Sequence, residues 1–449
     1  MRATALPAAH FTPTLATLRL TDVESAGAKG AVLGELIQAR FPVPPGFVVG
    51  TPCYHAFSQG GSQIEHALHE RVALTLAEFD LDDDEALAAG SQNVRALIEA
   101  EPLPGWLAAA VRSAYEALGA QVVAVRPSPI LRDPEDAYHA GMFDSFLGVD
   151  GAEALLHALR RCWSSLFSPH AIRARERRGL GPEGAELAVV VQAQVPAARA
   201  GVVFTLDPAT ANEDRIVVDA GRGLGVGVVS GAVSADRYVI DKGNLVVVSR
   251  VLRANRRAID EVDGLTAVRG SAPRETPAQV LTDSELALLA GLALRVEEHF
   301  GEAQDIEWAC DSEGKFWIVQ ARALGTTASA VREPWGTELV RGLGAAPGRC
   351  IGRARVVGSL TRARQLASGE ILVAHVTGPE SAPLMHGVGA IVTDTGGMSS
   401  YAAVVARRLG IPCVVGTAEA TNVVSDGQLI TVDGDHGLVL RAPALAPAS

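Results

Sequence analysis

Hydrophobic and polar positions along this chain follow two periods, and the change from one to the other marks its elements. Residues 22–50 predict a glycine-rich loop, a short amphipathic helix, a proline turn and then a strand. Helical spacing recurs around 61–100, 105–119, 151–179 and 282–300. Alternating runs bounded by turn residues predict strands at 121–128, 187–194, 201–205, 215–219 and 237–249. This mixture favours a multidomain fold that combines α/β and α+β parts.

The last third of the chain continues the pattern with a hairpin and a glycine-rich unit. The segment "DIEWACDSEGKFWIVQAR" (305–322) predicts two strands joined by a turn. Residues 325–345 have no strong period, so we expect a linker there. Residues 346–442 predict a compact α/β unit, and 443–449 a disordered tail.

Composition narrows the classes of protein that the chain can belong to. Of 449 residues, 48% are hydrophobic and 20% charged, which allows a sizeable core. The net charge of −12, without a basic block, argues against a nucleic-acid surface. Five scattered cysteines without CxxC spacing indicate reduced thiols inside a cell. No apolar run reaches ~18 residues and no signal-peptide pattern opens the chain, so we expect a soluble, cytoplasmic protein with no membrane partner.

The 305–322 hairpin gathers side chains that could hold a metal. Side chains alternate along a strand, so Asp305 and Glu307 share one face, and Gln320 and Arg322 share one face of the partner strand. If residues 311–314 form the turn, Asp305 lies opposite Gln320. Two carboxylates and an amide oxygen suit Mg²⁺, and Arg322 could hold a γ-phosphate. The alternative is a solvated hairpin face with an Asp–Arg pair.

Two other cations could bind phosphate, although each alone is equally compatible with an ordinary surface or paired charge. Lys29 lies in "GAKG", and Arg126 ends an apolar strand. Neither fits the GxxxxGK[ST] phosphate loop, so a P-loop ATPase is not supported.

A second candidate site lies in "TDTGGMSSYAAVVARRLGIPCVVGT" (393–417). Ser399 or Ser400 can cap a helix over about 401–409, which Gly410 and a following proline end. The backbone N–H groups at the start of that helix, after two glycines, predict an anion pocket beside Tyr401. The alternative is a common Gly-Gly turn with Tyr401 packed in the core.

These motifs together resemble the phosphoenolpyruvate synthase and pyruvate phosphate dikinase family, to which rifampin phosphotransferase is also similar. The resemblance covers nearly the whole chain. Its motifs are "GAKGAVLGEL…FPVPPGFVV", "VAVRPS…DPEDAYHAGMFDSFLGV", "VVVQAQVPA…GVVFTLDPAT" and "QDIEWA…WIVQAR". The family implies an ATP-grasp nucleotide-binding domain, with subdomains at 1–200 and 201–325. A linker at 326–345 and a swivelling phosphohistidine-type domain at 346–442 would follow.

The resemblance also implies roles for single residues. Lys29, Arg126 and Arg322 would hold ATP phosphates, under a loop that contains Gly141. Glu307 and Gln320 would hold Mg²⁺, with Asp305 in support. Gln192, Gln194 and Val195 would line the adenine pocket. The implied ligands are therefore Mg²⁺ and ATP, with ATP as the phosphate donor.

Four departures from the family change the expected chemistry. Tyr401 stands at the position of the phosphate-carrying histidine, and Val226 replaces the glutamate of a "GLGE" motif. The residues after Arg126 read Pro127, Ser128 and, later, Arg132, where the family has two serines and a glutamate. We also expect no acceptor domain within this sequence, so a separate chain could supply one.

The departures leave three interpretations open. Catalysis by Lys29, Arg322 and Tyr401 would make the protein an ATP-dependent phosphotransferase or ligase-type enzyme. It would then act directly on a small-molecule acceptor, a carboxylate or a hydroxyl. Alternatively, Tyr401 is itself phosphorylated as a regulatory site or an unusual carrier. In the third, the chain is a nucleotide-binding pseudoenzyme that serves a partner protein.

Overall fold

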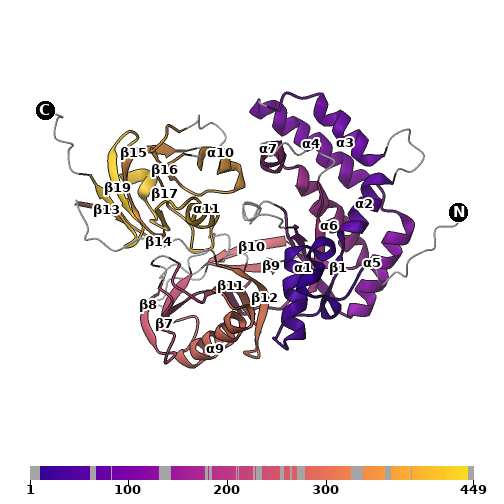
Figure 1. Ribbon diagram of the computed structural model, residues 1–449, viewed down its shortest axis with the longest axis horizontal. Helices are drawn as coiled ribbons and strands as arrows, with labels where there is room; N and C mark the ends of the chain where they lie inside the picture. The colour runs from indigo at the N-terminus through magenta and orange to yellow at the C-terminus, as the bar shows by residue number, and fades with distance from the viewer. Residues whose placement is uncertain are drawn as a thin grey trace. The chain divides into compact units, whose positions relative to one another are not determined.

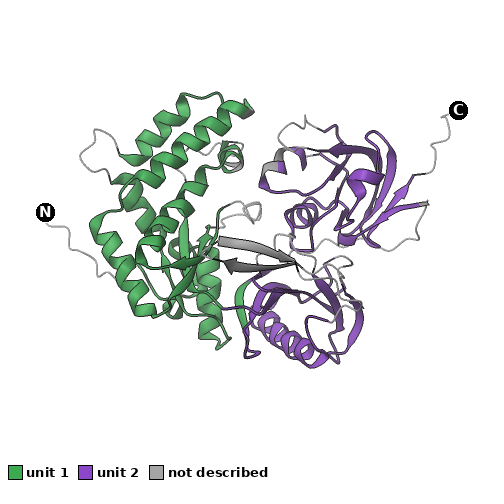
Figure 2. Cartoon of the chain, turned by 180° about the vertical axis from the view of Figure 1, so that it is seen from behind, with its two compact units in different colours: residues 1–195, 261–266, 317–320 green, residues 196–260, 267–316, 321–449 purple. Residues whose placement is uncertain are grey.

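The computed structural model describes most of the chain in two compact units. The described residues are 11–60, 67–81, 83–130, 143–176, 181, 185–208, 210, 212–225, 228, 235–252, 257–262, 265–270, 279–324, 337–358, 366–385 and 387–442. Unit 1 comprises residues 1–195, 261–266 and 317–320, and unit 2 comprises 196–260, 267–316 and 321–449 (Figure 2). The α/β and α+β multidomain class expected from the sequence is confirmed. The domain boundaries given above stay predictions.

Unit 1 consists of an antiparallel sheet covered by helices (Figure 1). The strand order is β1-β4-β2-β3. The strands are β1 (Gly46–Val49), β2 (Val122–Ser128), β3 (Phe146–Asp150) and β4 (Ala188–Ala193). The helices are α1 (Val23–Gln38), α2 (Thr51–Gln59), α3 (Leu68–Ala77), α4 (Asp84–Ala100), α5 (Gly105–Leu118), α6 (Ala152–Ser164) and α7 (Pro169–Glu176). Most of these bounds agree with the helical and alternating periods in the sequence, but α2 and β3 were not predicted, and the loop expected at the start of residues 22–50 is part of α1.

The core of unit 1 forms where the helices meet the buried strands β1 and β4. The indole of Trp163 on α6 is fully buried and stacks on Phe57 of α2, with 5.0 Å between ring centroids. Its Nε1 donates to the backbone oxygen of Leu187, 3.0 Å away, just before β4. Trp163 therefore joins two helices to the sheet, and its own indole N–H is satisfied by a hydrogen bond.

A six-stranded sheet in the order β12-β11-β5-β6-β7-β8 belongs to unit 2, except for residues 317–320 of β12, which belong to unit 1. Its strands are β5 (Arg199–Phe204), β6 (Arg215–Arg222), β7 (Asp236–Asp241), β8 (Val247–Val251), β11 (Gln304–Cys310) and β12 (Phe316–Ala323). Helix α9 (Asp283–Phe300) lies between β8 and β11 in sequence, and β9 (Arg257–Val262) and β10 (Leu265–Gly270) form a separate pair.

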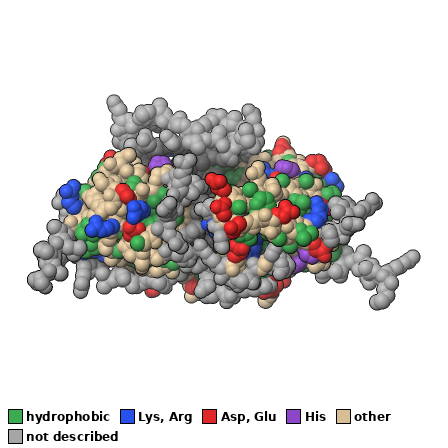
Figure 3. All heavy atoms as spheres, turned by 90° about the horizontal axis from the view of Figure 1, so that it is seen from above, with side chains coloured by type: hydrophobic (Ala, Val, Ile, Leu, Met, Phe, Trp, Pro, Cys, Tyr) green, Lys and Arg blue, Asp and Glu red, His purple; other side chains and the backbone are tan. Residues whose placement is uncertain are grey.

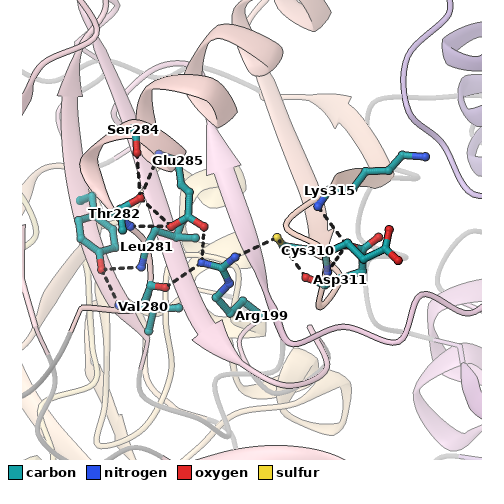
Figure 4. A network of polar contacts seen from close by, with 11 residues as sticks. Arg199, Val280, Leu281, Thr282, Ser284, Glu285, Cys310, Asp311 and Lys315 are labelled. Atoms are coloured by element: carbon teal, nitrogen blue, oxygen red, sulfur yellow. Dashed lines mark hydrogen bonds and ion pairs between the residues drawn. The ribbon is translucent and has the colours of Figure 1, made fainter.

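A network of polar contacts fixes the start of α9 to this sheet (Figure 4). Thr282 caps the helix by accepting from the N–H of Glu285, whose carboxylate accepts from Thr282 N in return. Arg199 of β5 donates from Nη1 to Glu285, at 2.6 Å, and from Nη2 to the sulfur of Cys310, at 3.3 Å. The helix cap is therefore tied to β5 and β11 by one guanidinium.

Unit 2 also contains an eight-stranded mixed sheet in the order β13-β20-β19-β15-β16-β17-β18-β14. Its strands are β13 (Thr337–Arg341), β14 (Leu343–Ala346), β15 (Arg349–Val357), β16 (Ile371–Ala374), β17 (Ala390–Thr393), β18 (Cys413–Val415), β19 (Leu429–Asp433) and β20 (Leu438–Arg441). The helices are α10 (Ala382–Met385), α11 (Tyr401–Leu409) and α12 (Ala420–Val423). Strands β15 to β18 run parallel to one another.

The expected linker at 325–345 is wrong for its second half. Residues 337–346 form β13 and β14, which pair with β20 and β18 respectively. Both strands lie at the edges of the sheet and both pairings contain a register shift. Backbone pairing at an edge needs no regular alternation of side chains, so the sequence period gives no signal there.

All five cysteines are free thiols, as the sequence predicts. Cys53, Cys162, Cys310 and Cys413 are buried, and burial raises the pKa of both Cys53 and Cys413 to about 12. These thiols are therefore protonated and poor nucleophiles at neutral pH.

On one face of the described residues the charges are mixed (Figure 3), and the described helices are short or polar. Acidic and basic side chains are interspersed with apolar ones on the face of the described residues in Figure 3. Within the described ranges, every helix lacks the length or the apolarity needed to span a bilayer.

A buried carboxylate joins β15 to β19 and should make unit 2 sensitive to acid. Asp433, which is fully buried, forms an ion pair with Arg349 on the opposing strand. It also accepts from His436 N at 3.1 Å. Burial alone would raise the pKa of Asp433, but these donors outweigh it and hold the pKa below its usual value of 3.8.

We predict that this pair contributes stability that is fully present above about pH 4 and is lost as the pH falls through the lower folded-state pKa. Asp433→Asn should flatten the fall in unfolding free energy between pH 5 and pH 2 in urea titrations. Asp426→Asn, which removes an exposed partner of Arg355, is the control and should keep the parent's slope. An unchanged slope in Asp433→Asn would contradict the assignment.

Candidate active site

The segment that carries Lys29 is held against the end of β2. The hydroxyl of Ser128 donates to the oxygen of Ala26 at 2.8 Å and accepts from the N–H of Gly30 at 3.0 Å. The N–H of Ala28 donates to the oxygen of Pro129 at 2.9 Å. We call this set of contacts between residues 26–30 and 128–129 the Ser128 latch. It fixes the turn of α1 that contains Lys29 next to the strand that carries Arg126.

Gly27 permits this approach for two reasons. Its backbone has φ +68°, which interrupts the helical conformation of α1. A Cβ atom there would lie 1.9 Å from the oxygen of Ser128. A side chain at this position would therefore meet both backbone strain and a steric clash.

Arg126 reaches the middle of β12, at residues that belong to unit 1. Its Nη1 donates to the backbone oxygen of Val319 at 2.5 Å, and its Nη2 donates to Oε1 of Gln320 at 3.0 Å. The structure thus brings Arg126 and Gln320, two of the expected site residues, into direct contact. An amide oxygen has two lone pairs, so Gln320 keeps one for another ligand.

Asp305 lies opposite Arg322 on the hairpin, and the expected pairing of Asp305 with Gln320 is wrong. The N–H of Leu324 donates to the oxygen of Ala303 at 2.8 Å, which sets this register. The turn accounts for one of the two positions by which the partner of Asp305 shifts. The carboxylate of Asp311 accepts the N–H groups of Glu313 and Lys315, and the loop between β11 and β12 is one residue longer than the four assumed.

The Asp305–Arg322 pair is the charged centre of this hairpin. Arg322 donates from Nε and Nη2 to Oδ2 of Asp305, at 2.9 and 2.7 Å. The Asp305 side chain is 3% exposed and that of Arg322 is 35% exposed. The Asp305 charge raises the pKa of Arg322, and Glu307 adds to the effect. Arg322 is therefore a fixed cation with an accessible side, suited to an anion.

The residues expected to line the adenine pocket carry structural contacts. Gln192 is buried and donates from Nε2 to the oxygen of Pro44 at 3.1 Å. Gln194 accepts the N–H of Gly148 at its Oε1, at 2.6 Å, and Val195 is partly buried. Their role toward adenine stays a prediction. Gly141, Val226 and Arg132 lie outside the described residues.

Tyr401 is the first residue of α11, and the helix ends at Gly410 with φ +65°, as expected. Ser400 occupies the N-cap position, but the expected side-chain cap is absent. The hydroxyls of Ser399 and Ser400 are buried and have no hydrogen-bond partner among the described residues. Tyr401 is half-buried and packs against the apolar cluster around Ala402.

The sequence analysis missed Arg407, a buried cation on the same helix. Its Nη1 donates to the oxygen of Ala345 at 2.8 Å, and its guanidinium lies 5.9 Å from the centre of the Phe204 ring. Burial lowers the pKa of Arg407 to about 10, although the charge of Asp305 opposes this. The "RR" at the end of the helical pattern was the available signal, but it does not indicate which arginine is buried.

The comparisons with known proteins agree with the motifs. Residues 23–338 match the family described as "Pyruvate phosphate dikinase, AMP/ATP-binding domain". The chain belongs to this family. Residues 366–437 match "PEP-utilising enzyme, mobile domain". Together they confirm the resemblance to the phosphoenolpyruvate synthase and pyruvate phosphate dikinase group.

Two curated relatives extend the similarity over most of the chain. A protein named "Probable phosphoenolpyruvate synthase" from Methanothermobacter thermautotrophicus is 38% identical over 94% of this chain and 62% of its own length. "Phosphoenolpyruvate synthase" from Pyrococcus furiosus is 35% identical over 94% of this chain and 58% of its own length. A solved structure of "Enzyme I (nEIt) protein" is 35% identical over 18% of this chain and 33% of that chain, with a TM-score of 0.17. The chain therefore spans about three fifths of the length of these two relatives.

We predict that Gly27→Ala will disrupt the Ser128 latch. The substitution should lower the free energy of unfolding by more than about 1 kcal/mol, measured by urea denaturation. Gly151→Ala is the matched control, because Gly151 has φ +87° and ψ 154°, close to the φ +68° and ψ 166° of Gly27, but no atom within 4 Å of an added Cβ. It shares the backbone strain without the clash. Equal losses in the two variants would show that contact with Ser128 contributes nothing.

Proposed function

We propose that this chain is an ATP-dependent phosphotransferase that transfers phosphate from magnesium ATP to a small-molecule acceptor without a phosphohistidine carrier. The observation that carries the proposal is the arrangement of cations and oxygen ligands in an ATP-binding family. Arg126 is bonded to Gln320, the Ser128 latch holds the Lys29 segment beside the same strand, and Arg322 is paired with Asp305.

Three cations would act on the phosphates of ATP. The guanidinium groups of Arg126 and Arg322 are both held by an oxygen of the hairpin, which limits their movement. Preorganised cations stabilise the charge that builds up on a transferring phosphoryl group. Lys29, at the start of the regular part of α1, would add a third positive charge.

The donor set of Glu307 and Gln320 fits Mg²⁺. Among the described residues, no cluster of three or more His, Cys, Asp or Glu side chains could hold a metal. Mg²⁺ does not need such a cluster, because it keeps several waters and shares the phosphates of its nucleotide. When bound, it would neutralise phosphate charge, and one carboxylate with one amide oxygen would be its protein ligands.

Tyr401 would bind or orient an anion at the start of α11 instead of carrying phosphate. A phenol with a pKa near ~10 is seldom ionised at neutral pH, so it attacks poorly but donates a hydrogen bond well. Its phosphate ester also transfers onward less readily than a phosphoramidate. We therefore do not extend the pyruvate chemistry in the names of the relatives to this chain.

We predict that the protein binds ATP in a magnesium-dependent way. Glu307→Ala and Gln320→Ala should each abolish the magnesium-dependent part of the binding enthalpy in isothermal titration calorimetry. Glu313→Ala, in the exposed loop of the same hairpin, is the control and should bind like the parent. No ATP binding by the parent protein would refute the proposed function.

A second prediction concerns Tyr401. The parent protein incubated with magnesium ATP should show no stoichiometric phosphotyrosine by mass spectrometry, and Tyr401→Phe should keep measurable ATP consumption. The ring, which packs in the apolar cluster, is unchanged in that variant. A phosphotyrosine that forms as fast as ATP is consumed would make Tyr401 a carrier and overturn this part of the proposal.

A further inference from the structure

The carboxyl ends of the parallel strands in unit 2 bring polar residues together that the proposed function does not use. Strand β16 ends before His375, β17 ends before Asp394, and β18 ends two residues before Thr417. These three strands are parallel neighbours, and Ala374 pairs with Thr393. In open α/β sheets, ligands bind at this edge, outside the carboxyl ends of the strands.

His375 and Asp394 form a pair at this edge. Nδ1 of His375 lies 3.2 Å from Oδ2 of Asp394. The side chain of His375 is 69% exposed, whereas that of Asp394 is 2% exposed. A carboxylate can only accept, so Nδ1 carries the proton and the neutral imidazole keeps its lone pair on Nε2.

Other contacts hold both members of the pair in place. The oxygen of His375 accepts from N and Oγ1 of Thr395, at 2.9 and 3.0 Å. The carboxylate of Asp394 accepts from the N–H of Thr421 at 2.9 Å and from the hydroxyls of Thr421 and Thr417. These donors fix the carboxylate, which in turn orients the imidazole.

The same edge contains a place for an anion. Helix α11, nine residues long, begins seven residues after Asp394, and its first N–H groups favour negative charge. The side-chain oxygens of Ser399 and Ser400 are buried without a partner among the described residues. Buried hydroxyls of this kind are costly unless a ligand satisfies them.

We propose that His375, oriented by Asp394, is the general base that activates a hydroxyl group of the acceptor. The inference rests on the proposed function and names the acceptor class. A carboxylate is already ionised at neutral pH and needs no base, whereas an alcohol must lose a proton to attack phosphorus. A base at the acceptor edge therefore selects a hydroxyl-bearing small molecule.

In this step the acceptor oxygen forms a bond to a phosphorus of ATP. The bond from that phosphorus to the nucleotide oxygen breaks, and the nucleotide leaves with the electron pair. The hydroxyl proton moves to Nε2 of His375, while Nδ1–H stays bonded to Asp394. The resulting imidazolium faces the buried carboxylate, which stabilises its charge.

The unit contains a second histidine–aspartate pair that serves as a control. Nδ1 of His436 lies 3.0 Å from both carboxylate oxygens of Asp433. That carboxylate is already paired with Arg349, and His436 follows it by three residues in a turn. His436 therefore belongs to a local structural contact and lies away from the carboxyl ends of β16 and β17.

The test uses the full chain with magnesium and ATP labelled with ³²P at its β- and γ-phosphates. Glycerol is the hydroxyl probe and acetate is the carboxylate probe. We expect label in glycerol and not in acetate. His375→Gln should lower the rate of transfer at least about a hundredfold with little change in the KM for ATP, and Asp394→Asn should lower it as well. His436→Gln should transfer at the parent's rate.

A spectroscopic measurement keeps the test independent of turnover. Long-range ¹H–¹⁵N NMR, with His375→Gln to assign the signal, should show the neutral Nδ1–H tautomer of His375 at pH 8, and Asp394→Asn should change it. The other tautomer would overturn the proposal. So would transfer to acetate alone, no transfer to either probe, equal rates in the parent and His375→Gln, or label on His375 itself. Failure of ATP to bind at all would instead refute the proposed function.

Discussion

The contact on which the phosphate-binding part of unit 1 depends is made by one hydroxyl group. Ser128 Oγ donates to Ala26 and accepts from Gly30, so it joins the first turn of regular helix in α1 to the end of a central strand. Lys29 lies inside the bridged segment, and Arg126 lies two residues before Ser128. Because the latch is short and buried, a change in the backbone on either side would move both cations together. Their spacing is therefore a property of the backbone more than of the flexible side chains.

Unit 2 treats several of its buried charges differently, by pairing each with an opposite charge. Arg322 is paired with Asp305, Arg237 with Asp219 through two bonds of 2.9 Å, and Arg349 with Asp433. Pairs of this kind cost desolvation and contribute modestly to stability, but removing one partner leaves an uncompensated charge. Substitutions at these carboxylates should therefore affect folding as well as binding, and a loss of activity in them is meaningful only beside a measurement of stability.

Much of the fold could be predicted from the sequence. In long segments such as α9 and β4, the spacing of apolar residues indicates both the type of element and its buried side. The predictions that were wrong concern features that depend on single backbone contacts. Part of the difference in the hairpin register comes from the turn, where the Asp311 side chain accepts two N–H groups in a loop one residue longer than expected. The strands β13 and β14 were not predicted, because backbone pairing at the edge of a sheet does not require alternating hydrophobic and polar residues. In the candidate site, residue types indicated the cations, but the Ser128 latch and the His375–Asp394 pair join residues far apart in sequence.

The strand order of the eight-stranded sheet has a consequence for how this part of the chain folds. Both edge strands, β13 and β14, are the first to be synthesised, and β13 pairs with β20, the last. The central parallel strands can assemble as they emerge, but one edge stays open until the ribosome has completed residues 438–441. During that interval β13 and β19 present unpaired backbone groups. Completion of the sheet thus depends on a contact of high sequence separation, which makes its closure slow and the nascent intermediate prone to association with other chains.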